Sequence, residues 1–323
     1  MNSDTFFTPV LFEEELIKYS PTRVWLNDTP VVLVRIEKTI YAYEDFCPHR
    51  GAPLSKGFVQ NGTLTCRYHG WQFNTKGENT CVPVKNKSVA CSLQKVHVGI
   101  EFGIIWVSKY VDAHIPVLSK ESPTFTLSGT IQANLLNTLE NFLEGSHTHF
   151  VHDKLVRSKE KKRQKIEAVL KPSETGFTVH YQTESPKGLV TYLTPSKFKN
   201  LKAVSTYICP NISILEYWND ANTLVARVEA LLSEQKTNTR YQARIFLHVG
   251  FLTPLVKIIA KPLFKKIIQQ DKIILELQEQ NIAHFKNRSF VSDQTDVVGT
   301  EIQKWLYSNA TKATEPIPFT VYW

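Results

Sequence analysis

The sequence predicts an α+β protein of two domains, an all-β domain over residues 1–113 and a larger domain over residues 114–323. Three observations indicate this division. A chain of 323 residues is long enough for two typical domains. Its first third contains short β-branched and aromatic runs separated by glycines, with no stretch that suits a long helix. Beyond residues 116–123, longer apolar runs precede a stretch with helical spacing.

The composition excludes several classes of protein. Apolar residues make up 42% of the chain and charged residues 21%, which is untypical of disordered or fibrous chains. The polar, acidic start does not resemble a signal peptide. The most apolar window, residues 249–264, is interrupted by two lysines and two prolines and is shorter than the ~20 residues of a membrane helix. Five widely spaced cysteines do not suggest a disulfide scaffold, so we expect a cytoplasmic protein without a transmembrane segment.

The formal net charge of +8 is concentrated in one short run. Residues 154–165 contain seven basic side chains against Glu160 alone, and the rest of the chain is nearly balanced. A general nucleic-acid-binding surface is therefore not expected. We predict that the run docks an acidic electron donor or borders the active-site entrance, where its charge would speed association. A solvated loop is the alternative interpretation.

Short strands position the chemistry of the first domain. β-Branched and aromatic runs predict strands at residues 24–26, 31–36, 39–43, 64–66 and 104–107. Two motifs follow strands: Cys47-Pro48-His49 and, after 16 intervening residues, Cys66-Arg67-Tyr68-His69. Thiolates and imidazoles on paired loops bind either a structural zinc or a [2Fe–2S] cluster with two cysteines on one iron and two histidines on the other. Gly51 and Gly70, which allow close backbone approach, favour the cluster.

Longer elements are predicted in the second domain. Strands are expected at residues 125–132, 165–170, 177–182, 190–193, 203–209, 212–218, 224–232 and 241–248. Helical spacing occurs at residues 137–152, 263–285 and 297–307. Because only short polar breaks separate successive strands, we expect a meandering antiparallel sheet followed by a long helix.

A second group of metal-ligand residues occupies positions 141–152, which carry three histidines and a carboxylate. Glu144 and His147 are three apart and fall on one face of the predicted helix. His147 and His152 are five apart, about 140° on an ideal helix, so both reach one metal only if the helix bends or ends between them. Gly145 allows such a break. His149 is interpreted as a bystander, and solvated histidines at a helix end are the alternative for the whole group.

Two histidines need a carboxylate to complete the facial triad of an oxygen-activating iron. Periodicity on the 263–285 helix singles out Asp271, which has apolar residues one turn before and one turn after it. A buried lone carboxylate is unfavourable unless it is paired or bound to a metal. Glu276 falls on the polar, solvent-facing side of the predicted helix, and Asp293 and Asp296 lie in a polar loop. A salt-bridge or helix-dipole role is the alternative for Asp271.

The two groups together resemble a known family. The segments Cys47-Pro-His49-Arg-Gly and Cys66-Arg-Tyr-His69-Gly-Trp71 resemble the two boxes of a Rieske iron–sulfur domain. Residues 141–152 are similar to the signature N-x-x-[D/E]-x-x-H-x-x-x-x-H of the catalytic domain of Rieske non-haem iron oxygenases. The resemblance covers nearly the whole chain. It implies a helix-grip catalytic domain with a large antiparallel sheet and a long C-terminal helix.

This resemblance also implies the cofactors and their ligands. The cofactors are a [2Fe–2S] cluster and a mononuclear non-haem Fe(II). The implied cluster ligands are Cys47, His49, Cys66 and His69, and the implied iron ligands are His147, His152 and Asp271. Glu144, at a position where aspartate is usual, would carry electrons between the two centres, and Asn141 would lie beside the iron. In the family the cluster of one subunit faces the iron of its neighbour, so we expect a homotrimer in which His69, Glu144 and His147 are linked across the interface.

The implied activity is O2-dependent hydroxylation, cis-dihydroxylation or oxidative demethylation of a small aromatic or alicyclic substrate. The sequence has no G-x-G-x-x-G motif, so a separate NAD(P)H-dependent reductase or a ferredoxin must supply the electrons. Aromatic candidates for the pocket are Phe198, Tyr207, Tyr217, Trp218 and Phe246. The alternatives are a non-catalytic Rieske electron-transfer protein and a zinc-stabilised lipid-binding domain.

Overall fold

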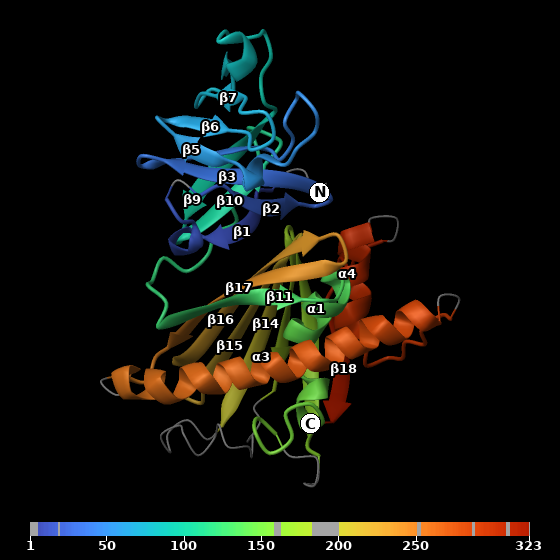
Figure 1. Ribbon diagram of the computed structural model, residues 1–323. Helices are drawn as coiled ribbons and strands as arrows, with labels where there is room; N and C mark the ends of the chain where they lie inside the picture. Colours follow the sequence, from blue (N-terminus) through green and yellow to red (C-terminus); the bar gives the residue numbers. More distant parts are fainter. Residues whose placement is uncertain are drawn as a thin grey trace. The chain divides into compact units, whose positions relative to one another are not determined.

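The computed structural model describes residues 6–18, 20–157, 163–182, 200–250, 253–285, 288–307 and 311–322. The chain divides into two compact units, Met1–Lys120 with Ser233–Lys236, and Glu121–Leu232 with Thr237–Trp323. Both are built mainly of antiparallel strands with few helices, which confirms the predicted α+β class (Figure 1). Each unit is described by itself below.

The first unit contains a six-stranded sheet in the order β1-β10-β9-β4-β3-β2 and a four-stranded sheet in the order β5-β6-β7-β8. The strands are β1 (Thr8–Phe12), β2 (Thr22–Leu26), β3 (Thr29–Ile36), β4 (Thr39–Glu44), β5 (Phe58–Gln60), β6 (Thr63–Thr65), β7 (Gln72–Phe73), β8 (Asn79–Cys81), β9 (Lys95–Glu101) and β10 (Ile104–Ser108). Three short 3-10 helices connect them: η2 (Glu13–Glu15), η3 (Leu54–Lys56) and η4 (Pro83–Lys85).

Strand β3 supports both faces of this unit. Val31 and Leu33 pack into one apolar cluster, whereas Val32 and Val34 pack into another that includes Cys47 and Cys66. A strand covered on both faces shows a continuous apolar run, which is why it was readily predicted. The other four predicted strands correspond to β2, β4, β6 and β10. Five strands of the unit were missed: β1, β5, β7, β8 and β9. Pro9 interrupts β1, charged and glycine residues dilute β9, and the other three are only two or three residues long.

The second unit is an eight-stranded antiparallel sheet in the order β11-β17-β16-β15-β14-β13-β12-β18. Its strands are β11 (Phe125–Ile131), β12 (Lys165–Ser173), β13 (Gly176–Tyr181), β14 (Leu201–Ile208), β15 (Ile212–Asn219), β16 (Leu224–Gln235), β17 (Asn238–Leu247) and β18 (Ile317–Tyr322). The predicted meander is confirmed from β12 to β17, and the strand predicted at residues 190–193 lies outside the described residues. Edge strand β18 was missed because Pro316 and Pro318 obscure it, although prolines are tolerated at sheet edges.

The helices of this unit differ from prediction in their bounds. They are α1 (Leu135–Leu143), the 3-10 helix η5 (Ser146–His149), α3 (Thr253–His284) and α4 (Val297–Tyr307). The helix predicted at residues 137–152 was wrong in its second half, because α1 ends at Leu143 and the chain turns into η5. Helix α3 begins ten residues before the predicted start. Pro254 falls in its first turn, where no backbone N–H is needed, and Pro262 lies between the packed residues Ala260 and Phe264.

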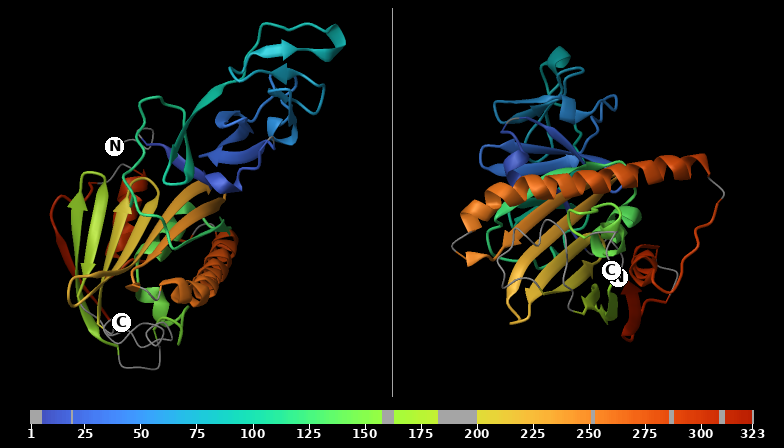
Figure 2. Two further views of the ribbon diagram at one scale, coloured as in Figure 1. Left: turned by 90° about the vertical axis from the view of Figure 1, so that its left-hand side faces the viewer. Right: turned by 90° about the horizontal axis from the view of Figure 1, so that it is seen from below.

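Helix α3 lies along the concave face of the curved sheet (Figures 1 and 2). Its inner side packs with Phe125, Ala243 and Ile245 of β11 and β17. Helices α1 and α4 pack with β12, β13 and β14 in a separate cluster. The space between α3 and the sheet is where the second site is formed. Across the described ranges, no helix combines the length and the apolar character that crossing a bilayer requires.

Candidate metal centres and catalytic pocket

Two loops of the same shape carry the cysteine and histidine motifs. In the first, the Gly51 N–H donates a hydrogen bond to the Cys47 carbonyl at 2.8 Å, and in the second the Gly70 N–H donates to the Cys66 carbonyl at 3.0 Å. Both glycines have positive φ, +72° and +70°, a conformation that glycine adopts without strain. Strands β4 and β6 end just before the two loops. These strands belong to the two different sheets of the unit, and the contact between the His49 and His69 rings shows that the two motifs lie side by side.

The sulfur and imidazole groups of these loops face in different directions. Cys47 and Cys66 are each 2% exposed, whereas His69 is exposed and His49 is half-buried. The His49 and His69 rings are 4.7 Å apart. Burial raises the pKa of the Cys47 thiol to about 11, and the neighbouring Cys66 thiol contributes to the rise. Two adjacent buried thiols and two adjacent outer imidazoles fit a [2Fe–2S] cluster held by one pair on each iron.

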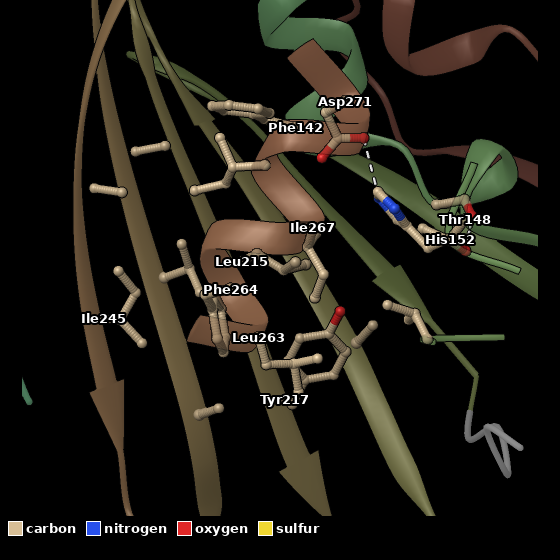
Figure 3. A pocket seen from close by; sticks show the side chains of 18 of the residues that line it. Phe142, Thr148, His152, Leu215, Tyr217, Ile245, Leu263, Phe264, Ile267 and Asp271 are labelled. Carbon is tan, nitrogen blue, oxygen red and sulfur yellow. Dashed lines mark hydrogen bonds and ion pairs between the residues drawn. The ribbon is translucent and has the colours of Figure 1, made fainter. Parts of the chain in front are cut away.

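Three side chains meet at the second site. His147 comes from η5, His152 follows it, and Asp271 comes from the middle of α3. Their ligand atoms all lie within 4.8 Å of one another. The His152 Nε2 atom is 3.0 Å from Asp271 Oδ1 (Figure 3). The His147 Nε2 atom is 3.5 Å from the same oxygen. Two imidazoles and one carboxylate that bind one face of the metal form the donor set of a mononuclear iron with open coordination positions.

Each histidine is oriented by a hydrogen bond at its other nitrogen. The Nδ1 atom of His147 lies 2.5 Å from Glu144 Oε1, and the Nδ1 atom of His152 lies 3.0 Å from Gln270 Oε1. Carboxylate and amide oxygens only accept hydrogen bonds, so both Nδ1 atoms carry the proton. The Nε2 lone pairs are then left for a metal. Gln270 was not identified from the sequence, because the adjacent Gln269 has the same side chain and only the folded register distinguishes the two.

Glu144 lies just past the end of α1 rather than on a helix face, which corrects the predicted geometry. Its carboxylate accepts hydrogen bonds from the Ser146 backbone N–H and from His147. Burial raises the pKa of Glu144, but the hydrogen bond and charge of His147 outweigh it, so the pKa lies below its usual value. The Glu144 side chain keeps 23% of its surface exposed. The predicted contact with His147 is therefore present, and the link to His69 of another subunit stays a prediction.

Asn141 on α1 lies beside the three converging side chains. Its Nδ2 atom is 3.5 Å from Asp271 Oδ1. Its Oδ1 atom is buried and has no hydrogen-bond partner within the described part of the chain. Buried polar atoms normally have a partner. An unpaired amide oxygen at this position fits a site that holds a metal and its bound water.

Charged residues also surround the loop that carries His147. Arg157 is buried and donates hydrogen bonds to the Gly145 carbonyl and the Thr148 hydroxyl, which ties down the loop that carries His147. It is therefore not part of the solvent-facing basic patch that was predicted, and residues 158–162 of that run lie outside the described residues. Burial lowers the pKa of His149 to about 4, with contributions from Arg157 and Arg163. His149 is not among the three grouped ligands, in keeping with its interpretation as a bystander.

A cavity of about 310 Å³ extends from His152 and Asp271 between α3 and the sheet (Figure 3). Its lining is predominantly apolar and includes Leu215, Ile245, Leu263, Phe264 and Ile267. The ionisable side chains of its lining all belong to the candidate metal site or contact the loop that carries it: Glu144, His147, His152, Arg157 and Asp271.

Only one described aromatic candidate for the pocket was correct. Tyr217 lines the cavity, whereas Trp218, the next residue on β15, does not, because successive strand residues face opposite sides. Tyr207 packs in the cluster beneath α1 and α4, and Phe246 lies against Arg244. Phe198 lies outside the described residues.

Two family models match the chain in the order of its two units. The Rieske [2Fe-2S] domain matches residues 6–98, and the vanillate O-demethylase oxygenase C-terminal domain matches residues 131–311. The second match alone covers more than half of the chain.

Curated relatives match over shorter stretches. The vanillate O-demethylase oxygenase subunit of a Pseudomonas species is 31% identical over 143 residues, 42% of this chain and 44% of the relative. Methylxanthine N1-demethylase NdmA of Pseudomonas putida is 32% identical over 164 residues, 46% of each chain. The 4beta-methylsterol monooxygenase of Methylococcus capsulatus is 31% identical over 159 residues, 45% of this chain and 42% of the relative. The chain thus aligns with less than half the length of each of these relatives.

Solved structures share the fold over nearly the whole chain. Dicamba monooxygenase bound to 3,6-dichlorosalicylic acid superposes with a TM-score of 0.79 at 18% identity, covering 95% of this chain and 97% of the other. Pseudomonas putida NdmA with caffeine superposes with a TM-score of 0.73 at 21% identity, covering 95% and 92%. At these identities the likeness shows the fold.

Proposed function

Because this chain belongs to the Rieske oxygenases that carry the vanillate O-demethylase oxygenase C-terminal domain, we propose that it is the terminal oxygenase component of such a system. Its cofactors are a [2Fe–2S] cluster and a mononuclear non-haem iron. In this proposal residues 1–113 form the Rieske domain and residues 114–323 the catalytic domain. The reaction is O2-dependent hydroxylation, dihydroxylation or oxidative demethylation of a small organic substrate.

One observation carries the proposal: two Cys/His loops lie together in one unit, three further ligand side chains converge in the other, and the second group opens onto an apolar cavity. A non-catalytic electron carrier would need only the first set. The match to a catalytic oxygenase domain therefore favours the enzyme. A zinc-stabilised lipid-binding domain would not need His147, His152 and Asp271 to converge beneath a substrate cavity.

Each proposed site residue has a distinct role. Cys47, Cys66, His49 and His69 hold the cluster, and His147, His152 and Asp271 hold the iron. When bound, the two centres supply electron transfer and oxygen activation. Glu144 and Gln270 keep the Nδ1 protons of the two histidines in place, so that both Nε2 atoms face the metal. Asn141 offers its unpaired amide oxygen to a group bound beside Asp271.

The cavity supports a neutral aromatic or alicyclic substrate. Its walls are apolar, and the Arg157 guanidinium already donates to Gly145 and Thr148. Apolar walls exclude water and bind a ring mainly through burial of apolar surface. The names of the relatives give substrates as different as vanillate, methylxanthine and methylsterol. A panel of different ring compounds therefore tests which class of ring this cavity accepts.

The proposed partners supply electrons from outside the chain. They are an NAD(P)H-dependent reductase, a ferredoxin or both, acting on a cytoplasmic homotrimer. The exposed His69 and the partly exposed Glu144 carboxylate support transfer between subunits, because each is accessible on its own unit. No disulfide joins any of the five cysteines, all of which the structure describes, and this supports a reducing compartment.

The proposal is tested by Asp271→Ala with Asp293→Ala as its matched control. Asp271 is 5% exposed beside both histidines, whereas Asp293 lies on an exposed loop. We expect iron to fall from about three to about two atoms per chain in Asp271→Ala, because the [2Fe–2S] cluster keeps two. The Rieske absorbance should persist, and substrate-dependent O2 uptake with a surrogate reductase should be lost.

The control should retain iron and O2 uptake over a panel of neutral aromatic and alicyclic substrates. Full iron content and activity in Asp271→Ala would move the carboxylate ligand elsewhere. Intact metal centres with no O2 uptake for any substrate in the panel would support the electron-carrier alternative.

A further inference from the structure

The first turns of α3 expose apolar side chains to solvent. Leu255 is 60% exposed, Ile258 is 71% exposed and Ile259 is 47% exposed. On a surface helix, apolar side chains normally face the core. The opposite side of the same turns already does so, because Val256 and Ala260 pack with the β11–β17 cluster. Residues 253–266, here called the basic-apolar segment, are therefore apolar on both sides.

The same segment is strongly basic. Lys257, Lys261, Lys265 and Lys266 lie within it, and no acidic residue occurs from residue 250 to residue 270. None of these four lysines forms an ion pair with any residue that the structure describes. The exposed apolar side chains are thus surrounded by unneutralised positive charge. This combination is typical of helices that lie on anionic lipid surfaces.

The segment also forms a wall of the substrate cavity. Val256, Ile259 and Leu263 line the cavity, and Ile259 is at the same time nearly half exposed. Ile259 therefore marks the rim at which the cavity meets the outer surface of the helix. Molecules that suit so apolar a cavity partition from water into membranes.

We propose that the basic-apolar segment docks on an anionic lipid bilayer, from which an apolar substrate reaches the cavity past Ile259. The 14 residues of the segment span about 21 Å, which suits a helix lying in the plane of the interface. Leu255 and Ile258 enter the headgroup region, and the lysines contact the lipid phosphates. A two-fold contact between two such segments would bring the same lysines together, so charge favours the bilayer over that contact. The head-to-tail contact of the proposed trimer pairs different surfaces, and the oligomeric mass tests it below.

The test uses the full-length holoprotein and vesicle sedimentation, which needs no activity. We expect sedimentation with vesicles of phosphatidylcholine and phosphatidylglycerol in equal parts, and little with pure phosphatidylcholine. Leu255→Ser with Ile258→Ser should abolish binding. Lys257→Gln, Lys265→Gln and Lys266→Gln together should weaken it by about a hundredfold, because each lysine near an anionic surface strengthens binding roughly fivefold. Added salt should mimic the lysine variant.

The matched control is Val84→Ser with Lys85→Gln and Lys87→Gln. It removes the same kinds of groups from an exposed site in the other unit and should bind vesicles like the parent chain. Unchanged Rieske absorbance and circular dichroism will show that every variant is folded. The proposal is overturned if the parent chain fails to sediment with anionic vesicles, or if the control loses binding equally. It is also overturned if the serine variants lower the oligomeric mass, since the face would then be a subunit contact.

Discussion

Gln270 shows how a residue that touches no metal can determine the geometry of a metal site. Its amide oxygen accepts the Nδ1 proton of His152, while Asp271, the next residue, faces the Nε2 atom of the same imidazole. Two consecutive residues of α3 thus hold the two edges of one ring. Glu144 orients His147 in the same way from the other side of the site.

We predict that Gln270→Leu lowers the iron affinity of the catalytic site by about 10- to 100-fold, the usual effect of losing a partner that orients a metal-bound histidine. Gln270→Glu should retain most of the affinity, because a carboxylate oxygen also accepts the Nδ1 proton. Iron retention against a graded chelator measures the change, and the Rieske absorbance should be identical in all three proteins. Equal loss in both variants would indicate a steric effect instead.

A buried ion network crosses the strands of the second unit. Glu229 on β16 is 0% exposed and accepts hydrogen bonds from Arg244 on β17 at 2.6 Å and from Arg227 at 2.9 Å. Arg244 is 2% exposed, and its Nη1 atom pairs with the Glu229 carboxylate at 2.6 Å. The network lies within the sheet that carries the cavity, so its loss should affect the fold rather than the chemistry directly.

We expect Glu229→Leu to lower the free energy of unfolding by about 3–5 kcal/mol, because it removes a fully buried carboxylate that pairs with the buried Arg244 guanidinium. Glu216→Leu is the comparison. It removes the other carboxylate that contacts Arg227, which is 22% exposed, and should cost less than about 1 kcal/mol. Denaturant unfolding measures both. Similar losses in the two variants would contradict a special role for burial.

The contact between α1 and α4 contains an unfavourable charge. Glu140 lies so close to Gly299 that a Cβ atom there would be 2.1 Å from its Oε1 atom. Burial raises the pKa of Glu140 above its usual value, and the charges of Glu144 and Asp296 add to the rise. Between the unfolded and folded pKa values the folded chain therefore binds more protons. It follows that this carboxyl group destabilises the fold increasingly as the pH rises through that range.

Glu140→Gln should consequently raise the melting temperature near pH 7 but have no such effect at about pH 3, where the parent carboxyl is almost fully protonated in both the folded and the unfolded state. Thermal unfolding at the two pH values, followed by circular dichroism, measures the difference. Asp293→Asn, at an exposed loop, serves as a control for a change of one charge. A gain of the same size at both pH values would show that charge is not the cause.

At the scale of the whole molecule, the proposed trimer predicts complementation between two inactive chains. Cys47→Ser should lose the cluster and Asp271→Ala the iron, so each variant alone should fail to oxygenate substrate. Coexpression with two different tags and purification through both should restore part of the activity, if the cluster of one subunit serves the iron of another. Coexpressing two tagged copies of the same variant is the control. A purified mixed oligomer without activity would argue for electron transfer within one chain.

Sequence reasoning succeeded where chemistry is local and failed where it depends on folded register. The spacings of Cys47 with His49 and of His147 with His152 are local, and Asp271 stood out because its helical neighbours are apolar. The structure brings His147, His152 and Asp271 together. Gln270, the cavity-lining side of β15 and edge strand β18 depend on how distant segments align. Helix α3 begins ten residues before the predicted start, because packing of Val256 and Ala260 with β11 and β17 sustains the helix on the N-terminal side of Pro262.

The iron ligands come from two segments that are far apart in the chain, since Asp271 follows His152 by 119 positions. A metal shared between them acts as a removable cross-link that closes a very long loop. Any ligand that binds only the folded chain adds RT ln(1 + [L]/Kd) to its stability, about 2.7 kcal/mol at a free concentration of 100 Kd. In the proposed holoenzyme, the metal adds to the apolar contacts that attach α3 to the sheet. In an iron-starved cell the catalytic unit would lose that part of its stability, so enzyme abundance itself would follow the availability of iron.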